Sequence, residues 1–267
     1  MKHIKKQFYF DLSDEEFSDK YGSVFKSVSV EDAKPRNQKA QQIEFMQTTN
    51  KRVVMATLFK EKRKNQKLLM PLPRMPLLFL SNAYDLYKHA TEILPKLENL
   101  IDLSIREDKD HRHLVYRYLG YKFSCITSLF SAVESFINES IPTEAMFPYE
   151  VGKQWSRDEI LRYMNTEDKI NKLMPFLFHP KAFAKHQPQK KEPLIRLKNI
   201  RDQIIHMKPL PNTTNELKSV LHGYSAHASL LQQVYKLNFN ESYEKVAEFM
   251  NFYIPGYVEE CQCSLDY

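Results

Sequence analysis

A long uninterrupted segment between residues 113 and 141 most restricts what this chain can fold into. It reads HLVYRYLGYKFSCITSLFSAVESFINESI and contains one glycine and no proline. Its apolar residues lie on more than one side of an ideal helix, as expected for a helix at the centre of a core. Pro142 cannot continue that helix and marks its end. The sequence therefore predicts a central helix with other elements packed around it.

Further helices are predicted on both sides of this segment. Apolar and aromatic residues recur at spacings of three and four in residues 77–101, which is typical of an amphipathic helix. Ser156 with Glu159 three residues later forms a capping box that predicts a helix start, and a second helix is expected from Thr166. Residues 179–193 are polar and contain proline, so we expect a loop there. Helices are then expected at 194–208, 214–239 and 241–254.

The first 70 residues differ from the rest and form an N-terminal extension or small α+β subdomain. Residues 4–12 and 24–32 have the β-branched and aromatic content of short strands. Residues 36–70 allow two interpretations. Thr48-Thr49-Asn50 could turn a hairpin between two apolar runs, whereas Ile43, Met46 and Leu58 nearly keep a helical stripe without glycine or proline. Both interpretations stay open, and the predicted fold class is mainly α with an N-terminal extension containing strand-like segments.

Composition restricts the function only weakly. The chain has 267 residues, of which 5 are glycine, so few tight turns are available and a turn-rich β architecture is disfavoured. A formal charge of +6 gives a mild preference for polyanionic partners. No signal peptide or stretch long enough to span a bilayer is recognisable. The odd number of cysteines favours a reducing, cytoplasmic compartment, with Cys261 and Cys263 as free thiols, since no second pair completes a metal site.

Arg201 and His206 are the strongest candidates for chemistry. An arginine can donate two parallel hydrogen bonds to the oxygens of a phosphate, and a histidine can exchange a proton near neutral pH. Together they meet the minimum for cleaving RNA without a metal. The spacing alone is unspecific, because Arg106 and His111 repeat it in a charged connector. On an ideal helix, positions five apart also point about 140° away from one another. A site shared between two helices or two subunits is therefore more natural than a site on one helix.

The order of the helices adds specificity. A helix with AYDLYKHATEIL is followed by a long helix with SLFSAVESFINESIP, an inserted helical pair at about 143–190, and then PLIRLKNIRDQIIHMKP and a further long helix. This arrangement resembles the HEPN superfamily, whose four-helix up-and-down domains carry an Arg-x4-6-His motif on the third core helix. The resemblance covers about residues 76–238. It leaves out the N-terminal extension, the insert, and a C-terminal helix and tail at 239–267.

The resemblance implies a metal-independent endoribonuclease that needs no cofactor. Such proteins are often toxins paired with an antitoxin protein, or effectors of anti-phage defence, and they usually act on RNA as homodimers. Arg201 would bind phosphate, His206 would be the general base or acid, and Asp202 would orient one of them. Glu134 and Asn138 are either supporting residues or ordinary polar residues of a half-buried helix. Basic residues expected to add phosphate contacts are Lys190, Lys191, Lys198 and Lys208. The alternative is a non-catalytic helical module that binds RNA or protein.

Overall fold

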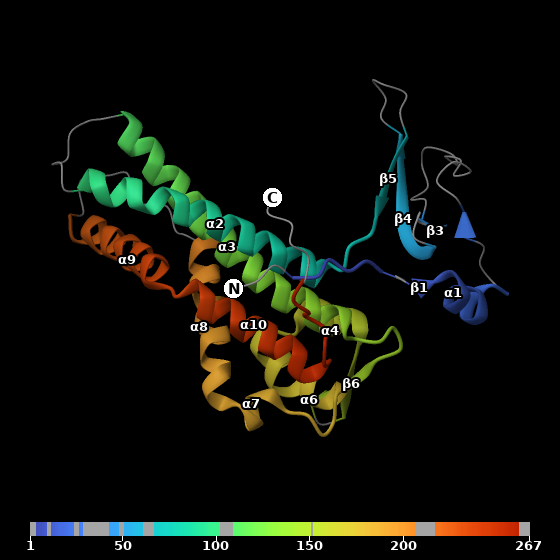
Figure 1. Cartoon of the computed structure of the whole chain (residues 1–267). Coiled ribbons are helices and arrows are strands. Elements are labelled where there is room, and N and C mark those ends of the chain that lie inside the picture. Colours follow the sequence, from blue (N-terminus) through green and yellow to red (C-terminus); the bar gives the residue numbers. More distant parts are fainter. Residues whose placement is uncertain are drawn as a thin grey trace. The chain divides into compact units, whose positions relative to one another are not determined.

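The computed structural model shows a mainly helical protein with short strands in its N-terminal region, as the predicted fold class requires (Figure 1). The chain divides into two compact units, residues 5–77 and residues 78–267 together with the first four residues. The structure describes residues 4–9, 12–23, 27–28, 43–47, 51–60, 67–101, 109–150, 152–206 and 217–261.

The smaller unit is built on one mixed sheet. Its strands are β1 (Leu12–Ser13), β2 (Ser27–Val28), β3 (Ile43–Gln47), β4 (Arg52–Lys60) and β5 (Lys67–Pro71). The central strand β4 pairs antiparallel with β3 on one side and with β1 and β5 on the other, while β2 lies parallel to β3. Met46, Val54 and Ala56 form a small core against which Phe8 packs. The hairpin interpretation of residues 36–70 is therefore confirmed, and the helical one was wrong.

A short helix, α1 (Asp14–Tyr21), was not anticipated between the first strands. Ser13 caps it, and the Ser13 and Glu16 side chains each accept a hydrogen bond from the other residue's backbone N–H. Phe17 on this helix is 1% exposed, and its ring centroid lies 5.1 Å from that of Phe45 on β3. The helix thus forms because its cap is local and its one large apolar residue covers the sheet.

The long helices that the structure describes lie in the larger unit, apart from the start of the first of them. In chain order its principal helices are α2 (Met75–Ile101), α3 (Lys109–Glu139), α8 (Pro188–Ile205), α9 (Leu217–Lys236) and α10 (Phe239–Tyr253). The first three residues of α2 belong to the smaller unit. The predicted central helix is α3: Ile126, Leu129, Phe130, Phe136 and Ile137 are each at most 1% exposed, and α3 contacts α8, α9 and α10. A buried cluster of Ala90, Ile93, Leu97 and Tyr118 joins α2 to α3.

The segment between α3 and α8 combines a hairpin with short helices. Its elements are β6 (Met146–Glu150), β7 (Lys153–Ser156), α4 (Arg157–Tyr163), α5 (Thr166–Asp168), the π-helix η1 (Lys169–Leu173), α6 (Met174–Leu177) and α7 (Phe183–His186). The predicted capping box of Ser156 and Glu159 is present at the start of α4, and a helix does begin at Thr166. The β6–β7 hairpin was not predicted from the sequence.

The expected loop at 179–193 was wrong over most of its length, because it contains the short helix α7 and because α8 begins at Pro188. Proline is well tolerated at the first helical position, because its missing N–H would have no partner there. A further proline, Pro193, lies inside the helix, and burial of Leu194, Leu197 and Ile200 offsets its cost. Lys190 and Lys191 consequently lie on helix rather than loop. The helix also ends earlier than expected, at Ile205.

Two of the three cysteines lie within the described residues. Cys125 on α3 is a buried free thiol, and burial raises its pKa. Cys261, expected to be free, is disulfide-bonded, so that expectation was wrong. Cys263 lies outside the described residues.

Candidate functional site

Helix α8 places Arg201 against the central helix α3. Leu194, Leu197 and Ile200 form the buried face of α8, and each is at most 1% exposed. Arg201 is the residue after Ile200 and lies next to this buried face. Its side chain is therefore directed at α3 rather than at solvent. The guanidinium carbon lies 4.4 Å from the centroid of the Phe130 ring, within the range of a cation–π contact. Packing of α8 on α3 therefore determines where Arg201 points.

Two carboxylates hold the Arg201 guanidinium. One Nη donates to Glu134 Oε2 at 2.5 Å, and the other donates to Asp202 Oδ1 at 2.8 Å. Lys198 Nζ bonds the second Asp202 oxygen at 2.8 Å, one helical turn earlier on α8. The Arg201 side chain is 17% exposed and the Glu134 side chain 35% exposed. Charge-assisted hydrogen bonds of this kind are the strong ones, particularly away from solvent.

The α5–η1 segment adds further hydrogen bonds to this network. Thr166 Oγ1 donates to the remaining Glu134 oxygen at 3.0 Å, and Lys169 Nζ donates to Asn138 Oδ1 at 3.1 Å. Lys169 is only 7% exposed. Burial lowers the pKa of Lys169, while the nearby Glu134 carboxylate acts in the opposite direction. Glu134 and Asn138, expected as weak candidates, thus lie in one polar network with Arg201 and Asp202.

His206 does not belong to that network. It is the C-cap residue of α8, beyond the last helical residue, with φ −103° and ψ 27°. Its backbone N–H donates to the Asp202 carbonyl at 2.9 Å, while its side chain is exposed. Within the described residues that side chain makes no hydrogen bond or ion pair. The structure thus brings together Arg201, Asp202, Glu134 and Asn138 and leaves His206 facing solvent at the end of the same helix.

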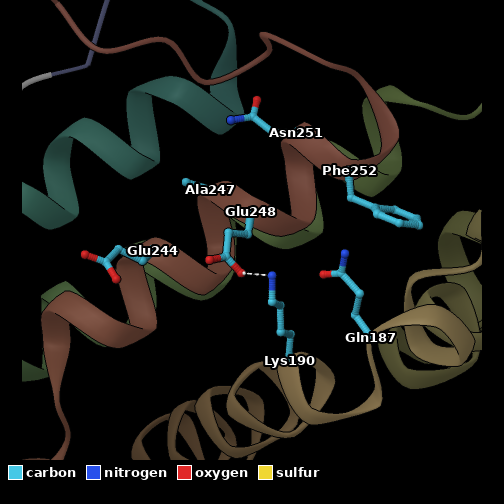
Figure 2. A pocket seen from close by; sticks show the side chains of 7 residues that line it. All are labelled: Gln187, Lys190, Glu244, Ala247, Glu248, Asn251 and Phe252. Carbon is cyan, nitrogen blue, oxygen red and sulfur yellow. Dashed lines mark ion pairs between the residues drawn. The ribbon is translucent and has the colours of Figure 1, made fainter.

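The lysines expected to bind phosphate do not gather into one patch. Lys190 pairs with Glu248 of α10 at 3.0 Å, beside a hollow of about 460 Å³ between α8 and α10 (Figure 2). Lys191 lies 3.9 Å from Glu167, and Lys198 pairs with Asp202 as described. Lys208 lies outside the described residues. Each of the three described lysines therefore already has an acidic partner, and none contacts Arg201.

Charge and donor count show what the network can still bind. Arg201, Lys198 and Lys169 are basic and Glu134 and Asp202 are acidic, so three positive groups face two negative groups. A guanidinium has five N–H donors, and two of those of Arg201 are bonded within the described residues. The remaining donors and the surplus positive charge allow an anionic oxygen to bind next to Glu134.

Sequence reasoning missed three residues of the network: Phe130, Thr166 and Lys169. Phe130 precedes Glu134 by four residues, which is one helical turn, so its position below the guanidinium follows from helix geometry once Glu134 is chosen. Nothing in the sequence indicated Thr166 or Lys169, because they lie in the insert outside the HEPN resemblance. Only the packing of that insert on α3 brings them to Glu134 and Asn138.

Known proteins give no further indication of the function. Comparison of the chain with protein-family models, curated proteins and solved structures finds no match. Among the residues that the structure describes, no three histidine, cysteine or carboxylate side chains gather in a way that could hold a metal ion. No helix among them is long and apolar enough to cross a membrane.

Proposed function

We propose that the protein is a metal-independent endoribonuclease of the HEPN type. The observation that carries the proposal is the pairing of a pre-positioned Arg201, held by Glu134 over Phe130 with N–H donors to spare, with an exposed His206 at the end of the same helix. Holding the guanidinium in place before substrate arrives means that little reorganisation is needed when charge develops. The order of the helices, with α2 and α3 followed by an insert and then by α8 and α9, also supports this proposal.

The proposed reaction needs one base, one acid and one cation. His206 takes the proton of a ribose 2′-hydroxyl, whose oxygen attacks the adjacent phosphorus. The P–O5′ bond breaks, the leaving 5′-oxygen takes a proton from a water molecule that acts as the acid, and a 2′,3′-cyclic phosphate remains. The free donors of Arg201 stabilise the negative charge on the non-bridging oxygens during attack. DNA lacks the 2′-hydroxyl and would not be cleaved.

The acidic residues act through Arg201. Glu134 and Asp202 each accept a hydrogen bond from one Nη of Arg201. These two bonds fix the plane of the guanidinium and the direction of its remaining N–H donors. Asp202 also accepts from Lys198, so the carboxylate itself is held. Of the predicted phosphate-binding lysines that the structure describes, only Lys198 lies beside the network, and it is the one we retain for substrate binding.

Metal independence and product chemistry give the direct test of the proposal. Purified protein is expected to cleave RNA in excess EDTA and to leave 2′,3′-cyclic phosphate or 3′-phosphate ends, because a His/Arg mechanism uses the 2′-oxygen as nucleophile. Product ends can be assigned by mass spectrometry of a short labelled oligoribonucleotide, with its deoxyribose counterpart as control. A 3′-hydroxyl product that forms only with added Mg²⁺ contradicts the proposal.

A shared site in a homodimer follows from the divergence of the two side chains. Arg201 is directed at α3, whereas His206 faces solvent, so one copy does not focus both on a single phosphate. Next to His206, Ile205 is 52% exposed and offers an apolar side chain for a subunit contact at this end of α8. We propose that the C-terminal ends of two α8 helices meet across a two-fold axis, so that each cleft combines groups from both copies.

Light scattering is expected to show a dimer, and mixed variants test the sharing. Chains carrying His206→Ala and chains carrying Arg201→Ala are each expected to be inactive alone. A mixture should regain part of the activity, because mixed dimers contain one cleft with both groups. The matched control mixes two His206→Ala preparations. A monomer that cleaves RNA contradicts the shared cleft and leaves the ribonuclease proposal standing.

One observation favours a second candidate, a non-catalytic helical module that binds RNA or protein. Arg201 is ion-paired with two carboxylates inside its own chain, which is also the pattern of a structural arginine. The cleavage assay in EDTA separates the two candidates. As a ribonuclease the protein would act in the cytoplasm, as a toxin restrained by an antitoxin protein or as an anti-phage effector.

A further inference from the structure

A second site candidate lies away from the Arg201 network, in a hollow of the larger unit. The hollow has a volume of about 290 Å³ and opens between α2, α3 and the junction of α9 and α10. Liquid water occupies about 30 Å³ per molecule, so the hollow has room for a small organic molecule with one ring and none for a polymer chain. It shares no residue with the network around Arg201.

Two largely buried residues of α3 place hydrogen-bond donors in this hollow. Tyr118 and Lys122 lie four residues apart and therefore on the same face of the helix. Each is only 7% exposed, and neither side chain makes a hydrogen bond or ion pair within the described residues. Among the described side chains, Tyr243 Oη is the one fully buried polar atom without a partner, so the Tyr118 hydroxyl and the Lys122 amine are accessible from the hollow. Both groups are therefore available to something that enters the hollow.

The chemistry of the two groups specifies an anionic oxygen ligand. Burial raises the pKa of Tyr118 to about 12, so the phenol stays protonated and can donate a hydrogen bond at neutral pH. An amine that is protonated donates and cannot accept. Burial lowers the pKa of Lys122, and a bound anion would offset that effect. Two donors one helical turn apart match the two oxygens of a carboxylate.

The rest of the hollow is mostly aromatic and aliphatic. Tyr87 of α2 stacks on Phe239 of α10 with ring centroids 4.1 Å apart and an angle of 13° between the rings. Leu94 and Leu237 add aliphatic surface, and Tyr235, which is 55% exposed, lies at the rim. A mainly apolar wall with a few converging polar groups is the usual composition of a small-molecule site. An inorganic anion would leave this apolar surface uncovered.

We propose that this hollow binds a small aromatic carboxylate, with the carboxylate on Lys122 and Tyr118 and the ring against Tyr87 and Phe239. The inference concerns a site that is independent of the ribonuclease proposal. Its test can therefore be run without RNA, and either proposal can fail without the other.

Calorimetric titration of the full chain with benzoate tests the site, with benzamide as the uncharged probe of the same shape. Benzoate is expected to bind, and benzamide to bind at least about tenfold more weakly, because a hydrogen bond to a charged group contributes on that order. Lys122→Met should lose benzoate binding by a similar factor. Its fold should be kept, because the amine makes no hydrogen bond or ion pair within the described residues and is replaced by an apolar side chain of similar length. Tyr118→Phe should weaken binding less, and Lys96→Met on the exposed side of α2 should not change it.

Three outcomes would overturn the proposal. They are no benzoate binding at about 10 mM, equal binding of benzoate and benzamide, and equal benzoate binding by the parent chain and by Lys122→Met. The first outcome would mean that the hollow holds water only. Circular dichroism of each variant shows whether lost binding reflects the missing amine or a lost fold, and Tyr118→Phe provides a second variant if Lys122→Met does not fold.

Discussion

His206→Ala is expected to reduce RNA cleavage by at least about 100-fold, the usual contribution of a positioned general acid or base. The substitution should lower the rate of cleavage without lowering the stability of the fold. The reason is that the His206 side chain is exposed and makes no hydrogen bond or ion pair within the described residues. Thermal unfolding of the variant should match the parent chain. Initial rates on a labelled oligoribonucleotide in EDTA give the measurement.

His111→Ala is the matched control for that experiment. Arg106 and His111 have the same spacing as Arg201 and His206 but do not lie on the helix where the resemblance places the motif, so removing His111 should leave cleavage unchanged. If His111 proves essential and His206 dispensable, the assignment of the motif is wrong. If both variants cleave like the parent chain, neither histidine is the base.

Arg201→Ala is expected to lower cleavage by about 10²–10³-fold, the range found when one donor to a developing oxyanion is removed. In contrast to His206→Ala, it should also destabilise the protein. The half-buried Glu134 carboxylate loses its cation, and the Phe130 ring loses the guanidinium that covers it. Because the Glu134 side chain is 35% exposed, solvent screening keeps the expected cost to about 1–2 kcal/mol. Urea unfolding measures this cost separately from the rate.

A second substitution separates the two roles of Arg201. In the double variant Glu134→Gln with Arg201→Ala, the unpaired carboxylate is gone, so stability should recover in part while cleavage stays lost. Arg201→Lys keeps the charge but cannot form a planar fork, and it should retain only a small part of the activity. If Arg201→Ala is destabilised but cleaves normally once folded, Arg201 is a structural residue and the non-catalytic alternative is favoured.

Helix geometry places Glu134 and Asn138 one turn apart on one face, and the structure has both in the network that includes Arg201. Their supporting role in a functional site stays a prediction. The same logic was incomplete for His206. The ideal-helix angle was applied to a residue that proves to be the C-cap, where the helix has already ended. The lysines were placed by charge alone, and charge does not reveal that Lys190 faces Glu248 of another helix.

The sequence by itself determined the features that depend on neighbours within a turn or two. These are the central helix α3, the cap at Ser156, and the helical position of Arg201, since periodicity and capping act over three or four residues. The hairpin at residues 36–70 was ambiguous, because strand formation depends on pairing with β1, β3 and β5 rather than on local pattern. The bond between Arg201 and Glu134 joins residues 67 positions apart, and that between Thr166 and Glu134 spans 32 positions. Only tertiary packing decides such contacts, because burial of Leu194, Leu197 and Ile200 against α3 is what turns Arg201 toward Glu134.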